Sequence, residues 1–331
     1  MKTNRLKPNR IVFFLLLVAT VCILTACGEP QLKVTYTVDG KKADEAPDRG
    51  LYEIESIKTN NKDCNATWDC NTWSLKTDPL TKNTTVNLDF VSTKHAVTMN
   101  GIGYDNLQEA FDAAGTDPAQ IHITKDLTSG GTTAVGCDII LYLHSHSIES
   151  AGSTTIVNNG KMKIIGAPDA EGDETVQLGK LSCTSGNENE AKTIVNFGSL
   201  NINNTEIENN SPAFNVWNSN NGESSMAING CLISKSGAES IAVVNSGTMI
   251  ISDSTITGGG DNKHPVVLMN NGGGSLTVNG SSIINNGSGY SVYKESGNVI
   301  IEASSNCPNT FGLEEENATT ETVEAPEGET V

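Results

Sequence analysis

Short stretches in which apolar residues alternate with small or polar ones recur through the second half of the chain. Their first apolar residues are 19 to 27 positions apart: Leu141, Met162, Leu181, Leu200, Met226, Met249, Leu276 and Val299. An isoleucine stands seven positions after five of these residues, as Ile148, Ile207, Ile233, Ile256 and Ile283. Alternation with period two predicts short strands, and its repetition predicts a solenoid with one coil per repeat.

A second recurring unit places an aliphatic residue two positions before an asparagine. The asparagines are Asn158, Asn196, Asn218, Asn245 and Asn270. Asparagine tolerates the left-handed backbone of a sharp corner, and amides stacked on successive coils can hydrogen-bond to one another. The column resembles the asparagine ladder of right-handed, pectate-lyase-type parallel β-helices, and crossovers between parallel strands are right-handed as a rule. We therefore expect an all-β fold whose main part is a right-handed parallel β-helix of about eight coils over residues 121–309.

Residues 97–120 predict a linker strand and a helix. Leu107, Ala110, Phe111 and Ala114 have helical spacing, and Gly115 follows them as a stop signal. The order of this helix, a short strand ending in lysine–aspartate–leucine and an alternating strand resembles the entry segment of parallel β-helix domains in bacterial surface proteins. The resemblance implies that the helix caps the open end of the solenoid.

Residues 32–96 predict a small β-sandwich, because apolar residues alternate along several short runs separated by turn residues. The module resembles the β-sandwiches at the N-termini of bacterial surface proteins. Its Trp68 and Trp73 are expected to pack in the core rather than to form a platform for a ligand.

Residues 1–26 have the form of an export signal, with a basic start, the apolar run 11–24 and small residues before Cys27. Leucine–threonine–alanine–cysteine at this position resembles the lipobox of bacterial lipoproteins. The resemblance implies that Cys27 becomes a lipidated N-terminus and that residues 27–31 form a tether. Two acyl chains hold a protein on a membrane almost permanently, so we expect a lipid-anchored protein on the extracytoplasmic side of a bacterial cell membrane.

Charge excludes several partners. The chain has 21 basic and 39 acidic residues, and removal of the leader would leave 17 basic residues and a net charge of −22. A field of that sign repels nucleic acid and anionic lipid surfaces. Residues 310–331 contain seven glutamates and few apolar residues, so this tail is expected to be disordered. No cofactor is expected, and the protein is expected to be a monomer.

The cysteines fit an exported protein. Cys64 and Cys70 are close enough in sequence for a disulfide in an oxidising exterior, and a reduced pair is the alternative. The repeat places Cys183 and Cys231 inside the solenoid and two coils apart. That separation, roughly 10 Å at the spacing of β-strands, exceeds the reach of a disulfide.

Catalytic residues are hard to find. The lyases of this resemblance use a positively charged base and calcium-binding aspartates, whereas Arg49 is the one arginine after the leader and lies outside the solenoid. The aspartates after residue 141 are Asp169, Asp173, Asp253 and Asp261, and no two of them align on neighbouring coils. Lys235 and Lys263 are expected to be solvated loop charges rather than bases. His144 with His146, and Glu206 with Glu208, lack a third ligand for a metal site.

The residue before each corner asparagine should point outward. This column reads Val157, Val195, Trp217, Val244 and Met269, with Tyr293 at the matching place, and the corners near Asn218 and around Lys263 and His264 are widened. Trp217, Asn218, Tyr293, Met269, Lys263 and His264 are therefore the candidate contacts for a glycan or a surface protein. The sequence predicts a non-catalytic, adhesin-like binding protein; one alternative is a polysaccharide lyase or glycoside hydrolase, and another is that a loop or the tail covers the column.

The anchor is testable. Cys27→Ser should leave an unlipidated precursor, because the thiol that accepts the diacylglyceryl group is gone. Incorporation of labelled fatty acid and partition into detergent would measure this outcome. Normal maturation and membrane retention of the variant would contradict the lipoprotein assignment.

Overall fold

The computed structural model describes residues 29–47, 50–69, 72–167, 177–184, 191–211, 213–219, 224–236, 241–259 and 266–311. The chain divides into two units, 1–92 and 93–331. Cys27, the leader and the acidic tail from residue 312 onward lie outside the described residues. No helix in the described ranges is both long and apolar enough to cross a membrane.

The first unit is built from two small sheets. Sheet A has the order β2-β1-β6-β3, with β1 parallel to β6, and sheet B is the hairpin β4-β5. The strands are β1 (Leu32–Val38), β2 (Lys41–Ala43), β3 (Tyr52–Thr59), β4 (Ala66–Asp69), β5 (Ser74–Thr77) and β6 (Thr84–Ser92). Trp68 lies edge-on to Phe90 with ring centroids 5.3 Å apart, and edge-on to Trp73 at 5.4 Å. Both tryptophans pack against the buried residues of β6, as the sequence predicts.

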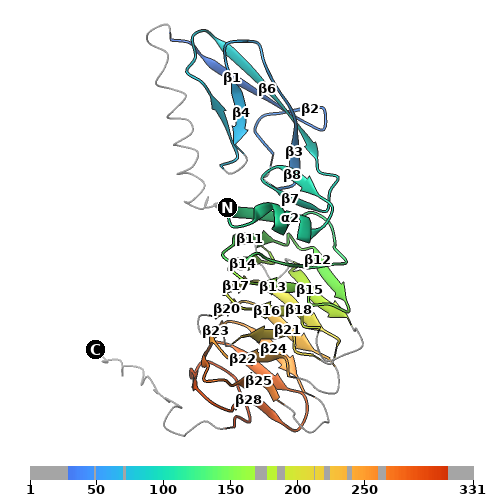
Figure 1. Ribbon diagram of the computed structural model, residues 1–331, viewed down its shortest axis with the longest axis vertical. Helices are drawn as coiled ribbons and strands as arrows, with labels where there is room; N and C mark the ends of the chain where they lie inside the picture. The colour runs from blue at the N-terminus through green and yellow to red at the C-terminus, as the bar shows by residue number, and fades with distance from the viewer. Residues whose placement is uncertain are drawn as a thin grey trace, which may run out of the picture. The chain divides into compact units, whose positions relative to one another are not determined.

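The second unit is a parallel β-helix whose coils contribute strands to three sheets (Figure 1). The first two strands of sheet C, residues 97–99 and 102–104, precede the coils and pair antiparallel. Sheet C contains β7 (Val97–Met99), β8 (Ile102–Tyr104), β9 (Pro118–Ile123), β11 (Asp138–Tyr142), β14 (Lys161–Ile165), β17 (Ser199–Asn203), β20 (Ser225–Asn229), β23 (Thr248–Ser252), β26 (Ser275–Asn279) and β29 (Asn298–Ile301). Sheet D contains β12 (Ser147–Ala151), β15 (Gly179–Thr184), β18 (Thr205–Asn209), β21 (Leu232–Lys235), β24 (Thr255–Gly258) and β27 (Ser282–Asn285). Sheet E contains β10 (Gly131–Thr132), β13 (Ile156–Asn158), β16 (Ile194–Asn196), β19 (Val216–Asn218), β22 (Val243–Asn245), β25 (Val266–Asn270) and β28 (Tyr290–Lys294).

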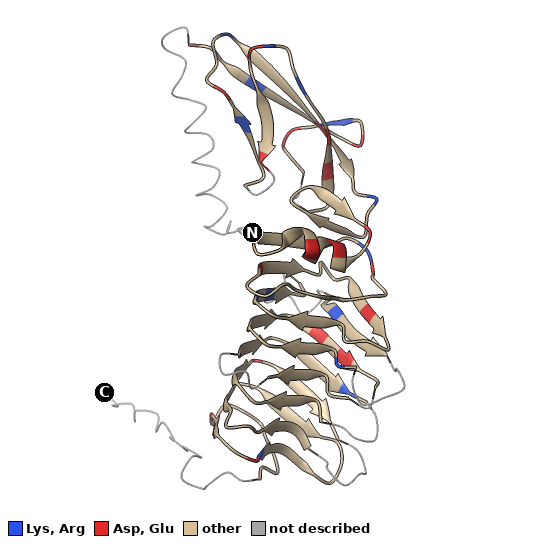
Figure 2. Cartoon of the chain, in the orientation of Figure 1, with Lys and Arg blue, Asp and Glu red and all other residues tan. Residues whose placement is uncertain are grey.

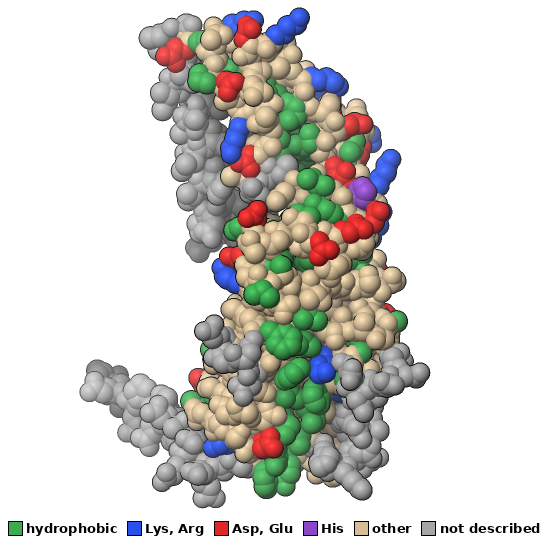
Figure 3. All heavy atoms as spheres, viewed as in Figure 1, with side chains coloured by type: hydrophobic (Ala, Val, Ile, Leu, Met, Phe, Trp, Pro, Cys, Tyr) green, Lys and Arg blue, Asp and Glu red, His purple; other side chains and the backbone are tan. Residues whose placement is uncertain are grey.

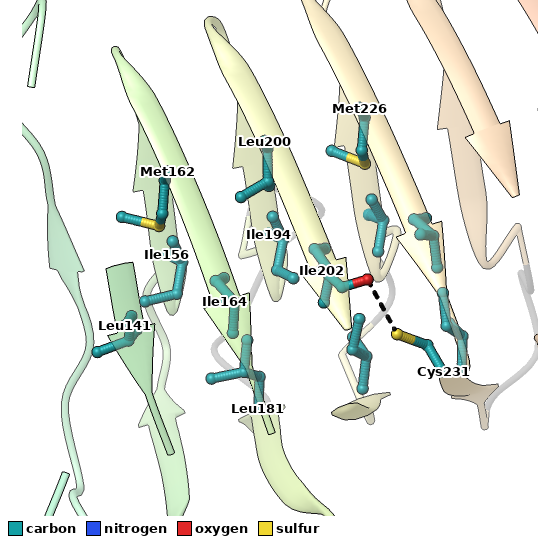
Figure 4. Close-up of a cluster of buried hydrophobic side chains, with 14 of the residues drawn as sticks. Leu141, Ile156, Met162, Ile164, Leu181, Ile194, Leu200, Ile202, Met226 and Cys231 are labelled. Atoms are coloured by element: carbon teal, nitrogen blue, oxygen red, sulfur yellow. Dashed lines mark hydrogen bonds between the residues drawn. The ribbon is translucent and has the colours of Figure 1, made fainter. Parts of the chain in front are cut away.

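The inward apolar residues form one continuous core along the solenoid, and Figure 4 shows several of its coils. Two positions of the predicted register are wrong. Met162 pairs with Ile139 rather than with Leu141, and Leu181 lies in sheet D between Ile148 and Ile207. Strand β15 carries the same glycine–x–leucine pattern as the sheet C strands, so the pattern alone could not separate the two sheets.

The asparagine ladder runs inside the corner between sheets E and C. The side-chain amide of each asparagine donates to the carbonyl oxygen of the next at 2.7–2.8 Å, from Asn158 through Asn196, Asn218 and Asn245 to Asn270. All five are fully buried. A buried amide is costly unless it is hydrogen-bonded, so the ladder requires an asparagine on every coil that it crosses.

Helix α2 (Leu107–Ala114) closes the N-terminal end of this unit. The Asn106 side chain accepts a hydrogen bond from the Glu109 amide, and Gly115 ends the helix at a positive φ of 56°. Its apolar face belongs to the same buried cluster as the first coils. The Gln108 carboxamide also accepts from the Thr132 amide at 2.8 Å and donates to the Thr132 carbonyl at 3.0 Å, which ties the helix to β10.

Two neighbouring isoleucines test the register. Ile251 is fully buried and Ile250 is 47% exposed, although they are adjacent on β23. Ile251→Asp should lower the stability by several kcal/mol, because it buries an unpaired carboxylate, whereas Ile250→Asp should change it by less than about 0.5 kcal/mol. Thermal and denaturant melts of the two variants would measure the difference. Equal stability of the two variants would contradict the inward assignment of Ile251.

Candidate functional site

The outer face of sheet E carries the predicted column in register. Val157 pairs with Val195, Val195 with Trp217, Trp217 with Val244, Val244 with Met269, and Met269 with Tyr293. Phe311 continues the column through a bridge to Tyr293. Figure 3 shows hydrophobic side chains gathered in a band over these strands. We call the column from Val157 to Phe311 the sheet E stripe.

The stripe is not uniformly accessible. Val195 and Val244 are only 6% and 3% exposed. Val195 lies beside the larger Trp217, and Val244 lies between the larger Trp217 and Met269. Trp217, Met269 and Tyr293 are half-buried, and Phe311 is 46% exposed. The reachable part of the stripe is therefore a series of separate side-chain surfaces.

Two groups of rings stand on the stripe. Trp217 meets Phe197 edge-on at 6.0 Å, and the Lys192 ammonium lies over the Trp217 ring at 5.4 Å. Nearer the end of the described chain, Tyr293 and Phe311 stack at 5.1 Å with an interplanar angle of 3°. Tyr290 packs on Phe311 at 5.0 Å. These contacts hold the rings in fixed orientations on a rigid sheet.

Of the predicted contact residues, one is corrected by the structure and two lie outside the described residues. Asn218 is fully buried, and its amide is used by the ladder and by the Thr248 carbonyl at 3.0 Å, so it cannot reach a ligand on the outer face. The prediction of Asn218 as a contact is therefore wrong, because a corner asparagine faces into the ladder. Lys263 and His264 fall outside the described residues.

An open groove of about 730 Å³ adjoins the stripe at the first coils. It is lined by Val135, Gly136, Cys137, Asn159, Gly160, Lys161, Phe197, Gly198 and Ser199. These residues come from the corners between sheets E and C on three successive coils. A groove of this volume is within the usual range of small-ligand sites.

Several charged residues of the solenoid lie on the strands of sheet D (Figure 2). The Lys180 ammonium lies 2.6 Å from the Glu208 carboxylate and 3.3 Å from that of Glu206. Burial alone would lower the pKa of Lys180, but the hydrogen bond that its ammonium donates to Glu208 and the charges of both glutamates outweigh it and raise the pKa. The three side chains therefore form an ion-paired group, and Lys180 is held in its charged state.

Lys235 is buried, which corrects its assignment as a solvated loop charge. It occupies an inward position of sheet D opposite Asn209, and its ammonium donates to the carbonyls of Asn209, Ser211 and Ser236. Burial lowers the pKa of Lys235 to about 8, against a smaller raising effect of Cys183. Because its ammonium faces the interior, Lys235 is not placed to act on a bound polymer.

Cys183 and Cys231 are buried, free and two coils apart, as predicted. Burial raises the pKa of the Cys231 thiol to about 11 and that of Cys183 above its ordinary value, so neither is an activated nucleophile. Cys64 is also buried, but Cys70 lies outside the described residues, so their pairing stays a prediction.

His144 and His146 have different partners. His144 hydrogen-bonds across coils to His122, Nε2 to Nδ1, at 2.8 Å, while His146 lies 3.5 Å from Asp126. In the part of the chain that the structure describes, no three histidine, cysteine or carboxylate side chains gather in a way that could hold a metal ion.

Comparisons with known proteins add no family. No protein-family model, curated protein or solved structure matches this chain.

Sequence reasoning missed the groove and Phe197. The groove depends on corner residues that show no periodic pattern, and Phe197 occupies a corner position held by asparagine in Asn159 and serine in Ser246. The one signal was an aromatic residue between a ladder asparagine and a corner glycine. Phe197 becomes a candidate site residue only because the structure places its ring beside that of Trp217.

The burial of Lys235 predicts a pH effect. Its folded pKa of about 8 lies below the ordinary value of about 10.4. The unfolded chain therefore binds more protons between these values, and this group makes folding more favourable as the pH rises from 8 to 10. Lys235→Met removes the effect, so the difference in melting temperature between wild type and variant should shift in favour of wild type over that range. A constant difference would mean that the three carbonyls hold the ammonium charged.

Proposed function

We propose that the protein is a non-catalytic, adhesin-like lipoprotein of the bacterial cell surface whose β-helix binds neutral glycans through the sheet E face. The observation that carries the proposal is the set of oriented rings at Trp217, Tyr293 and Phe311, with Phe197 beside them. The lipid anchor on Cys27 would fix the place of action, and the solenoid would supply a rigid, extended surface.

The accessibility of the stripe favours a glycan over a protein. A protein interface needs a contiguous apolar centre that the partner covers completely. Here Val195 and Val244 are buried on either side of Trp217, so the stripe offers separate platforms. A sugar ring needs one platform with polar groups around it, and this spacing suits a polymer of such rings.

Charge supports a neutral ligand. The chain has a formal net charge of −18 at pH 7, and such a charge opposes polyuronates and nucleic acids. The Lys192 ammonium already lies over Trp217 and Phe214, so its charge is partly used within the protein.

An enzyme acting on the lateral face is the alternative. Glu206 and Glu208 are a carboxylate pair that it could use, since both lie within 3.3 Å of the Lys180 ammonium. Hydrolysis by a carboxylate pair needs one acid free to protonate the leaving group and a second carboxyl group on the other side of the bond, whereas both of these carboxylates are engaged by the same ammonium. The arrangement therefore favours binding over hydrolysis.

Trp217 tests the proposal. Trp217→Ala should weaken the binding of a neutral glycan about tenfold or more, because exposed aromatic side chains carry a large share of binding energy. Its melting temperature should stay near that of wild type, since the ring is not part of the core. A glycan array, calorimetric titration and thermal melts would measure these effects, with Leu232→Ala, an exposed position on sheet D, as the control.

Two outcomes would contradict it. A lower melting temperature with unchanged affinity would mean that Trp217 is a packing residue and that the binding face lies elsewhere. Release of unsaturated or newly reducing sugars from the polymer would favour the enzyme.

A further inference from the structure

We propose that the groove at the corners of the first coils is a saccharide site that holds one neutral, linear glycan chain along the solenoid axis and leads it onto the ring pair Phe197–Trp217. This inference rests on the proposed function and names a site and a ligand class that the stripe alone does not give.

Close coil packing builds the floor of the groove. A Cβ atom on Gly160 would lie 2.5 Å from the Cys137 amide nitrogen, and one on Gly198 would lie 2.0 Å from the Gly160 carbonyl oxygen. Neither position can carry a side chain without moving a neighbouring coil. The floor is therefore closely packed backbone without side chains at these two positions, and it runs from coil to coil in the stacking direction.

The walls combine apolar and polar groups. Val135 is 80% exposed at one end, and the half-buried Phe197 stands at the other. The side-chain amide of Asn159 donates a hydrogen bond to the Thr133 carbonyl at 2.8 Å, which holds Asn159 in place. The Ser199 hydroxyl accepts a hydrogen bond from the Ser225 hydroxyl at 3.2 Å. The Lys161 ammonium is paired with Asp138 at 2.8 Å, so the charges of this pair cancel.

The backbone of the groove is already hydrogen-bonded, which argues against a peptide. The Gly160 carbonyl accepts from the Ser199 amide at 2.8 Å and from the Asn158 side chain at 3.0 Å. The Gly198 carbonyl is used in the same way by Ser225 and Asn196. An extended peptide that adds to a sheet needs free main-chain groups, so recognition here depends on side chains.

Geometry favours a linear sugar chain. Successive coils stack about 4.8 Å apart, and one sugar ring in an extended chain advances by a similar distance. The three coils that line the groove can therefore each face one ring of the same chain. Phe197 offers an aromatic surface to a ring, and Asn159 and Ser199 offer an amide and a hydroxyl to its substituents.

The test is calorimetric titration of the full-length protein in detergent. The probes are neutral oligosaccharides of two to six units from cellulose, xylan and mannan, with oligogalacturonate as the anionic probe. Affinity for one neutral series should rise with length over about three units and then level off. Phe197→Ala and Val135→Asp should each weaken that affinity about tenfold, and Phe197→Tyr should keep it because the ring remains.

Ile250→Ala, at an exposed position on the outer face of sheet C, is the control and should bind as wild type does. Melting temperatures identify any variant that merely fails to fold, and Val135→Asp should leave the melting temperature unchanged because Val135 is so exposed.

If wild type binds a neutral series and Trp217→Ala weakens that binding, but Phe197→Ala and Val135→Asp do not, the groove inference is wrong and the proposed function stands. If wild type binds none of the neutral series, both are wrong. Tighter binding of oligogalacturonate would overturn the neutral class.

Discussion

Each coil of the solenoid can bury its apolar side chains only when the coils beside it place similar residues at the same register position. The interior between three sheets is narrow, and a polar side chain that faces inward must find a partner on an adjacent coil. The asparagine ladder solves this requirement at one corner, where each amide donates to the next carbonyl. At the next corner Ser254 and Ser281 do the same, since their hydroxyls accept from the amides of Cys231 and Ser254. Inward positions are therefore tightly restricted in residue type.

The same stacking frees the outer surface. Outward positions make no contribution to the core, so the sheet E stripe can carry valine, tryptophan, methionine and tyrosine on successive coils of one backbone geometry. The main-chain groups of the lateral faces are used between coils, which leaves recognition to side chains. A surface of this kind holds its outward side chains at regular intervals, so that little conformational entropy is lost on binding.

Much of the fold could be predicted because inward positions repeat. The spacing of the ladder asparagines and of the isoleucines of sheet D predicted the coils, and the spacing of Leu107 and Phe111 predicted the capping helix. The error at Leu181 has a physical source, since a strand of sheet D can carry the alternation that sheet C requires. The prediction that Lys235 is solvated was wrong because the sequence around a lysine on a short strand does not show that the carbonyls of Asn209 and Ser211 accept its hydrogen bonds in the interior.

The candidate site was less predictable, because it depends on distances between coils and not on the repeat. The sequence placed Trp217, Met269 and Tyr293 in one outward column, but the burial of Val195 and Val244 depends on the size of their neighbours. Asn218 was assigned two incompatible roles, and the ladder excludes the external one. The floor of the groove contains Gly160 and Gly198, where successive coils come into backbone contact. The close stacking that the core requires therefore also keeps side chains off the floor at these two positions, so the groove needs no departure from the fold.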